Sequence, residues 1–244
     1  MNIIALDTVA GASSVAVFSG GKKVYNYRKV LDRGHAEVLI PMMKEAISSV
    51  SFEFLDLELI AVTVGPGSFT GIRVGLATAR SLSVAAKVPV IGVTSFEAVA
   101  ASITEKEWAG VPVLIALETR RDDFYLQMFN EARARLGEPK AVGSLDIVSY
   151  VSDQLGLQTD ILVAGDGAER AVSEIGGRSE RFKCRLASSL AGPDAIQVAE
   201  IAQESHLSGY ACLPAEPFYL RAPHVQVPIK SGSQNKVMGS NLKF

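Results

Sequence analysis

The sequence predicts an α/β fold made of two related units, and three observations lead to that prediction. Apolar runs bounded by turn residues alternate with stretches of helical periodicity along most of the chain. A short run in the second half, VLIALET at 113–119, resembles NIIALDT at 2–8. The 244 residues, 48% of them hydrophobic, suffice for two small units with buried cores.

In the first half, three strand-like runs separated by glycine turns come before the helices. The expected elements are strands at 2–8, 13–18, 22–30, 57–64 and 88–93, and helices at 35–50, 71–86 and 95–103. Thr70 and Ser95 are the expected N-terminal caps of the last two helices, because a hydroxyl can accept a hydrogen bond from a free backbone N–H. This order predicts a mixed sheet covered by helices.

The second half repeats the beginning of the first. Asp7 and Thr8 correspond to Glu118 and Thr119, which indicates a duplicated unit or a chance similarity between two short runs. The expected elements here are strands at 113–119, 123–129 and 160–165, and helices at 145–155 and 193–206. The predicted domains are 1–106, 107–223 with the C-terminal helix included, and a flexible tail at 224–244, which lacks periodicity.

Composition excludes several classes of protein. A net charge of −2 is unlike the basic footprint of a protein that binds nucleic acid unaided. Cys184 and Cys212 are isolated, which is neither a disulfide framework nor a zinc pattern and fits a reducing compartment. No basic leader or apolar run of about 20 residues is visible. We therefore expect a cytoplasmic protein with no membrane segment.

The stretch GPGSFTGIRVG, residues 65–75, has two interpretations. It fails both phosphate-loop templates, because no Lys follows the glycines and the third glycine of a dinucleotide fingerprint comes one residue late. A helix N-terminus still attracts anions. A vestigial nucleotide or anion site would comprise Asp7, Gly65, Gly67, Ser68 and Thr70.

The other interpretation is close packing of the helix. Gly67, Gly71 and Gly75 share one face, and each glycine inside a helix costs about 1 kcal/mol, so another backbone is expected nearby. The preceding helix has an apolar arc of roughly 200°, about twice what one core face needs. Either both helices bind a partner or both are buried within the chain. The candidate partner-binding residues are Leu39, Met42, Met43, Gly71, Ile72, Gly75, Leu76 and Ala79.

No catalytic residue or metal site is predicted. None of the three histidines has a second histidine at ligand spacing. Asp7 stands at a strand end, where actin-like and sugar-kinase-like folds place a metal-phosphate ligand, and Glu118 is its equivalent. The turns that follow are not the small, glycine-rich hairpins that bind phosphate in those folds. Gly11 is the one glycine between Val9 and Ala12, and two bulky arginines follow Glu118.

Five stretches in this order resemble the bacterial TsaB (YeaZ) family: LDT, RGHAEVLIP, GPGSFTGIRVGLATARSL, PVIGVTSFEAVA and PFYLRAP. The resemblance is close over residues 1–103 and loose until Pro217. It implies two tandem actin-like ATPase (ASKHA, RNase H-like) lobes, the second reduced. One departure is Glu118-Thr119-Arg120, where the family commonly has an Asp-Ala-Arg type of motif.

The resemblance also implies a function. Members are non-catalytic scaffolds that activate TsaD in the formation of N6-threonylcarbamoyladenosine in tRNA, together with the ATPase TsaE. It implies a TsaD heterodimer, a homodimer when alone, and tRNA contact only through the complex. No cofactor of its own is implied, and ATP or ADP would bind at the complex interface. The alternatives are an ASKHA-type ATP-binding hydrolase or peptidase-like relative that acts unaided, and a homodimeric interaction module.

Overall fold

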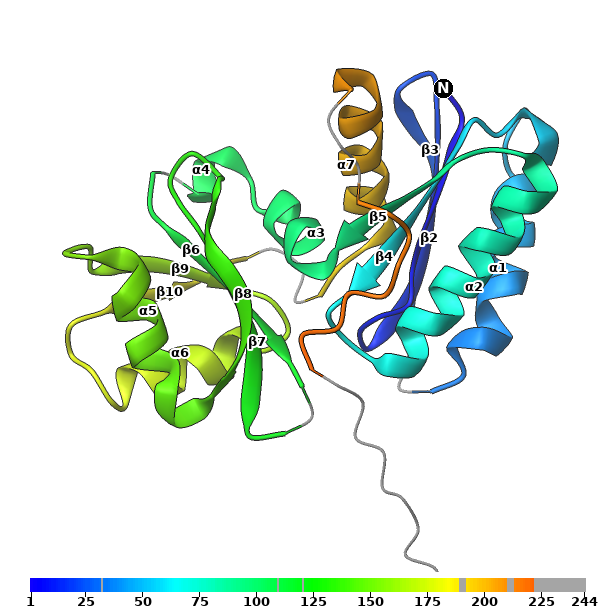
Figure 1. Cartoon of the computed structure of the whole chain (residues 1–244). Helices are drawn as coiled ribbons and strands as arrows, with labels where there is room; N and C mark the ends of the chain where they lie inside the picture. Colours follow the sequence, from blue (N-terminus) through cyan, green and yellow to red (C-terminus); the bar gives the residue numbers. More distant parts are fainter. Residues whose placement is uncertain (32, 109, 120, 189–191, 210–212, 222–244) are drawn as a thin grey trace, which may run out of the picture.

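The structure, a computed structural model, describes residues 1–221 except 32, 109, 120, 189–191 and 210–212. The expected tail at 224–244 lies outside the described residues. The chain forms two lobes, each built on a five-stranded mixed sheet (Figure 1). Among the described residues, no helix is both long enough and apolar enough to pass through a bilayer.

The first sheet consists of β1 (Ile3–Asp7), β2 (Ala12–Ser19), β3 (Lys22–Val30), β4 (Leu59–Gly65) and β5 (Val90–Thr94), in the order β3-β2-β1-β4-β5. Strands β1 to β3 pair antiparallel, whereas β4 and β5 are parallel to β1 and β4 respectively. β1 is central and buried on both faces. Ile4 and Leu6 point into one core, and Ile3 and Ala5 into another, as strand alternation requires.

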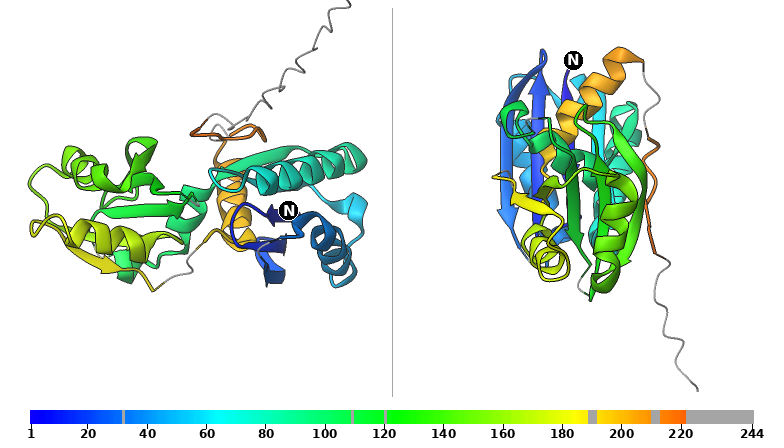
Figure 2. Two further views of the ribbon diagram at one scale, coloured as in Figure 1. Left: turned by 90° about the horizontal axis from the view of Figure 1, so that it is seen from below. Right: turned by 90° about the vertical axis from the view of Figure 1, so that its left-hand side faces the viewer.

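Helices α1 (His35–Ser48) and α2 (Phe69–Ala86) cover one face of this sheet. They lie side by side on its outer face, away from the second lobe (Figures 1 and 2). The apolar arc of α1 is wide because the helix packs against both the sheet and α2. The short 3-10 helix η1 (Phe54–Asp56) connects α1 to β4.

The second sheet repeats the first. It consists of β6 (Val113–Glu118), β7 (Asp123–Phe129), β8 (Arg135–Gly143), β9 (Asp160–Ala164) and β10 (Lys183–Leu186), in the order β8-β7-β6-β9-β10. Its outer helices are α5 (Ile147–Leu155), preceded by η2 (Ser144–Asp146), and α6 (Ala168–Gly176). Nine residues in each of α5 and α6, against 14 in α1 and 18 in α2, make this lobe the reduced one. The repeated strand order confirms the two tandem RNase H-like lobes.

The lobes exchange their last helices. α3 (Ser95–Ser102) follows β5, yet its apolar side packs with the short α4 (Glu105–Trp108) against the second sheet. α7 (Ala195–Ser208) follows β10 but packs on β1 and β2 of the first sheet. Both helices lie between the lobes (Figure 2). The assignment of the C-terminal helix to the second domain is therefore corrected, because sequence order does not determine which sheet a terminal helix covers.

Candidate functional site

The glycine-rich turn joins β4 to α2 and holds the helix against the end of β1. Ser68, not Thr70, is the N-cap of α2, and its Oγ accepts a hydrogen bond of 3.3 Å from Gly71 N–H. A Cβ on Gly71 would lie 1.9 Å from the carbonyl oxygen of Thr8, and one on Gly75 would lie 2.7 Å from Thr8 Oγ1. Thr8 Oγ1 also donates a hydrogen bond of 2.7 Å to the Gly71 carbonyl. The glycine row therefore accommodates this chain's own backbone.

The expected partner-binding side chains point into the same core. All eight are buried in the folded chain: Leu39, Met42, Met43, Gly71, Ile72, Gly75, Leu76 and Ala79. This corrects the face assignment made from spacing, because the apolar arcs of α1 and α2 are used by the sheet and by each other. The outward faces of the two helices carry other residues, among them Ile40 and Val84, which are 45% and 80% exposed.

A cleft of about 490 Å³ lies between the lobes, beside the glycine turn. Of the five residues expected for a vestigial nucleotide or anion site, Gly67, Ser68 and Thr70 line it. Asp7 and Gly65 are not among its lining residues. From the second lobe, the cleft is lined by the β6–β7 turn and by Asp166, with Glu118 and Arg121 among the charged groups.

Asp7 is fully buried at the end of β1. Neither of its carboxylate oxygens has a hydrogen-bond partner of good geometry among the described residues. The pKa of Asp7 is raised to about 7, mainly because burial disfavours the charged carboxylate. The nearby charge of Asp194 also raises this pKa, whereas the Thr63 side chain, the Val9 backbone and the charge of Arg28 lower it. A buried carboxyl with this pKa is largely protonated below neutral pH and lies away from the surface of the cleft.

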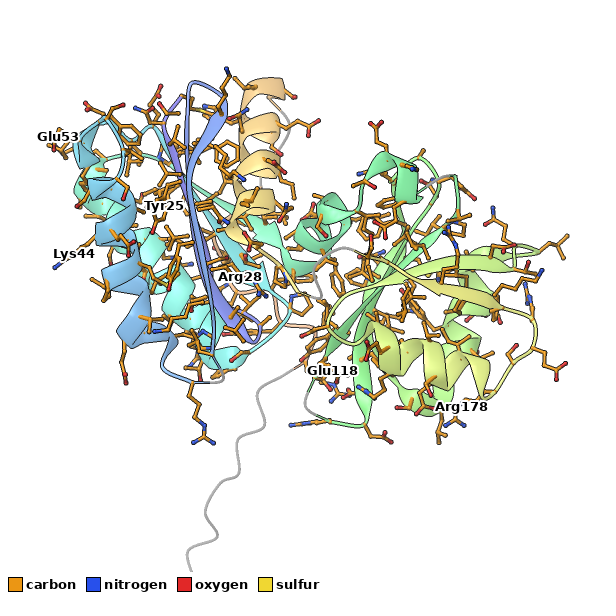
Figure 3. All side chains as sticks on the ribbon, turned by 180° about the vertical axis from the view of Figure 1, so that it is seen from behind. Tyr25, Arg28, Lys44, Glu53, Glu118 and Arg178 are labelled. Carbon is orange, nitrogen blue, oxygen red and sulfur yellow. The ribbon has the colours of Figure 1, made fainter. Side chains whose placement is uncertain are left out.

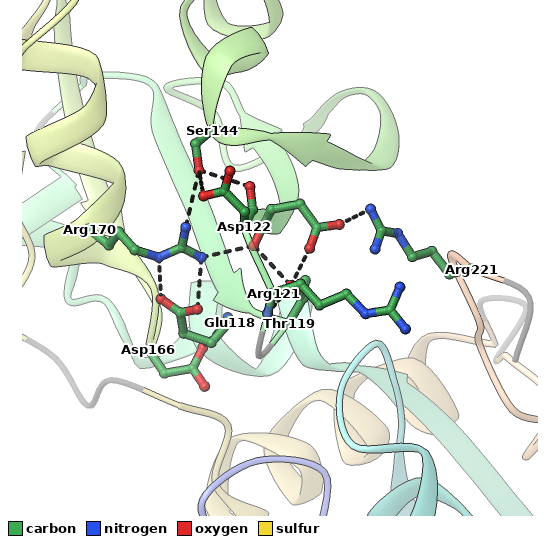
Figure 4. A network of polar contacts seen from close by, with 9 residues as sticks. Glu118, Thr119, Arg121, Asp122, Ser144, Asp166, Arg170 and Arg221 are labelled. Atoms are coloured by element: carbon green, nitrogen blue, oxygen red, sulfur yellow. Dashed lines mark hydrogen bonds and ion pairs between the residues drawn. The ribbon is translucent and has the colours of Figure 1, made fainter. Parts of the chain in front are cut away.

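Glu118 occupies the equivalent position at the end of β6 and is engaged by its own lobe (Figure 4). Arg170 of α6 donates from Nε to Oε1 at 2.9 Å and from Nη2 to Oε2 at 2.8 Å. The same guanidinium lies 3.6 Å from the centre of the Phe124 ring and donates to the Asp123 carbonyl. This bidentate pair neutralises the carboxylate at the position where a cation-binding acid was considered.

Other polar groups around the β6–β7 turn extend this network (Figure 4). The Glu118 N–H donates to Asp166 Oδ1 at 2.9 Å, and burial raises the pKa of Asp166 to about 6. Asp123 pairs with Thr119 of the same turn and with Arg221 near the end of the described chain. Within the described ranges, no group of three or more His, Cys, Asp or Glu side chains is arranged to hold a metal ion.

His35, at the start of α1, is hydrogen-bonded within the first lobe. Its Nδ1 lies 2.9 Å from the Ser13 Oγ of β2.

The sequence matches the family model described as "TsaD: tRNA N6-adenosine threonylcarbamoyltransferase" over residues 26–206. It is 28% identical over 226 residues to the tRNA threonylcarbamoyladenosine biosynthesis protein TsaB of Haemophilus influenzae, covering 91% of this chain and 94% of that one. The chain belongs to the TsaB (YeaZ) family. The Escherichia coli TsaB protein is 33% identical over 125 residues, 51% of this chain and 53% of that one.

The structure of YeaZ from Pseudomonas aeruginosa has the same fold as this TsaB-family chain. The two superpose with a TM-score of 0.73 at 24% identity, over 90% of this chain and 99% of the other. The superposition spans both lobes, so the two chains share the arrangement of their lobes as well as the fold of each.

Sequence reasoning missed the arginines of this TsaB-family structure. Arg170 and Glu118 are 52 residues apart, and Arg221 meets Asp123 from a segment after the last helix. No local spacing indicates either pair.

Replacing Arg170 with Met is expected to destabilise the chain by about 1 to 2 kcal/mol. Glu118 is about one-third exposed, so water compensates part of the loss. Arg178→Met is the matched control. Arg178 lies in the exposed turn after α6, at the far side of the lobe, and pairs with Glu174 of that helix (Figure 3). Urea unfolding of both variants measures the difference. Equal losses of unfolding free energy in the two variants would contradict the larger contribution to stability predicted for the Arg170–Glu118 pair.

Proposed function

We propose that the chain is a non-catalytic scaffold that binds and activates a TsaD-type subunit in the formation of N6-threonylcarbamoyladenosine in tRNA. The sequence relationship to TsaB proteins supports the pathway. The observation that carries the non-catalytic role is the state of the two strand-end carboxylates. Asp7 is buried, with its pKa raised to about 7, and Glu118 is bound bidentately by Arg170. Neither carboxylate is therefore free and ionised at the cleft, as a ligand of a phosphate-bound metal ion would be.

The proposed docking surface is the outward side of α1 and α2. Ile40 and Val84 are exposed apolar side chains there, and the aromatic ring of Phe69 is partly exposed near the cleft. The inward residues Leu39, Met42, Met43, Gly71, Ile72, Gly75, Leu76 and Ala79 support this surface by fixing the two helices. A TsaD-type lobe of the same fold family is the proposed partner.

The remaining components follow from the same proposal. TsaE joins the TsaD complex, tRNA contacts this chain only as part of it, and the chain self-associates through the same surface when alone. We propose no cofactor for the chain itself, and ATP or ADP binds where the subunits meet. The modest net charge of −2 supports an indirect contact with tRNA.

The test is threonylcarbamoyl transfer to tRNA by TsaD of the same organism with TsaE, ATP and threonylcarbamoyl-AMP. We expect product only when this chain is present. The double variant Ile40→Glu/Val84→Glu is expected to weaken TsaD binding at least tenfold, because charges replace apolar contacts. The measurement is binding by calorimetry together with product formation.

The matched control is Val24→Glu/Val30→Glu, which changes two side chains of β3 with similar exposure, 47% and 73%. It is expected to bind and activate TsaD normally. If both double variants bind TsaD equally well, the docking surface does not lie on the outward side of α1 and α2. Product formation without this chain, or ATP hydrolysis by this chain alone, would overturn the scaffold proposal.

A further inference from the structure

Residues 213–221, here called the strap, run from the edge of the first sheet to the second lobe (Figure 1). The Gly92 N–H donates to the Leu213 carbonyl at 2.9 Å, which forms an antiparallel bridge with β5. The Phe218 N–H donates to the Val64 carbonyl at 2.9 Å. Two backbone hydrogen bonds thus hold the strap to the first lobe.

Two glycines of the first lobe leave space for this path. A Cβ on Gly92 would lie 2.6 Å from the Pro214 carbonyl oxygen, and a Cβ on Gly65 would lie 2.8 Å from that of Phe218. Such distances are too short for any side chain, so both positions require glycine while the strap is in place. The strap backbone therefore packs directly against β4 and β5 of the first sheet.

The strap also covers part of α2. Arg80 donates from Nε and Nη2 to the Ala215 carbonyl, at 3.1 and 2.5 Å. The Tyr219 ring lies 5.3 Å from the Phe69 ring, and its Oη accepts a hydrogen bond of 3.3 Å from Arg73 Nε. The guanidinium of Arg73 is in turn 3.7 Å from the centre of the Phe69 ring. An aromatic and cationic patch, Phe69–Arg73–Tyr219, forms from two distant segments.

The second lobe holds the far end of the strap. Arg221 forms an ion pair with the carboxylate of Asp123, whose side chain is only 6% exposed and which Thr119 also contacts. Between these anchors, Phe218 packs against the cores of both lobes. Arg221 is two residues after Tyr219, so its pairing with this fixed carboxylate limits where Tyr219 can lie on α2.

We propose that the Asp123–Arg221 pair is a latch through which the second lobe controls the docking surface on α2. With the latch closed, the strap holds Tyr219 on Phe69 and completes the patch that a TsaD-type partner contacts. With the latch open, the strap keeps only its contacts with the first lobe, so it leaves α2 more often and the patch is present for less of the time. The partner part of this inference rests on the proposed function; the latch itself does not.

The first test is amide hydrogen exchange of the chain alone. Arg221→Met is expected to speed exchange at the Phe218 and Gly92 amides at least tenfold, because the strap loses its anchor in the second lobe. Arg221→Lys keeps a cation and is expected to restore most of the protection. Arg178→Met removes another arginine ion pair of the second lobe and is expected to leave both amides unchanged. Equal exchange in Arg221→Met and Arg178→Met would overturn the latch.

The second test is affinity for TsaD. Arg221→Met and Tyr219→Ala are both expected to weaken binding about tenfold, although Tyr219→Ala keeps the latch and near-normal protection at Gly92. Binding unchanged in both variants, with the wild-type chain binding, would show that the patch takes no part in docking and would overturn the control of α2. If the wild-type chain itself does not bind TsaD, the proposed function fails, and the exchange result decides the latch independently.

Discussion

Gly71→Ala is expected to destabilise the chain by about 3 to 5 kcal/mol or to prevent folding, although alanine is the better helix former. The added Cβ would lie 1.9 Å from the Thr8 carbonyl oxygen, which is backbone at the end of the central strand and cannot turn away. Relief requires α2 to move off the sheet, which would open the core around Ile72 and Leu76. Thermal and urea unfolding measure the loss.

Gly176→Ala is the matched control for that substitution. Gly176 also lies in a helix, its φ is not positive, and a Cβ there meets no atom within 4 Å. We expect a neutral effect or a gain of up to about 1 kcal/mol. Similar stability of the two alanine variants would contradict the close approach of α2 to Thr8. The same geometry means that a large residue at Gly75 would test core packing, not partner binding.

Asp7→Asn is expected to change how stability depends on pH. The pKa of Asp7 is raised from 3.8 to about 7 in the folded chain. Between about pH 4 and 7 the folded state therefore binds more protons than the unfolded state, and stability falls as the pH rises. The full loss has an upper bound on the order of 4 kcal/mol. An asparagine does not titrate, so the variant should lack this decline.

The decisive quantity is the difference in unfolding free energy between Asp7→Asn and wild type at pH 5 and at pH 8. We expect Asp7→Asn to gain several kcal/mol of stability relative to wild type when the pH rises from 5 to 8. Asp166, with a pKa raised to about 6, titrates in both proteins and cancels in this comparison. Parallel stability curves from pH 5 to 8 would mean that Asp7 is ionised in the folded chain.

Much of the architecture followed from the order of apolar runs, and the exceptions have physical causes. The first-half strands and helices lie where periodicity predicted them, and the β-β-β-α-β-α order recurs in the second half. β10, with four residues that are not buried, carries no hydrophobic signal. β8 is an edge strand with Gly137 and Pro139 inside it. α6 was missed although its sequence, AERAVSEIG, has clear helical periodicity.

The site was less predictable than the fold. Glycines four residues apart correctly indicated a close backbone approach, but periodicity reports that a face is buried and not what covers it. Thr8, more than sixty residues before Gly71, is the group that approaches. Caps were misplaced at Thr70 and Ser95, where Ser68 and Thr94 serve, because several adjacent hydroxyls fit the same signal.

The exchange of α3 and α7 has a consequence for how the chain is made. Until α7 emerges from the ribosome, the inner face of the first sheet, with Ile3 and Leu59, lacks its main cover, because only Ala98 of α3 belongs to the same cluster. The first lobe thus cannot complete its core when its own residues have been synthesised, and a nascent chain ending near residue 106 would present apolar surface to other molecules. Synthesis of residues 195–208, and not the order of the lobes, therefore sets the moment at which this apolar face can be covered.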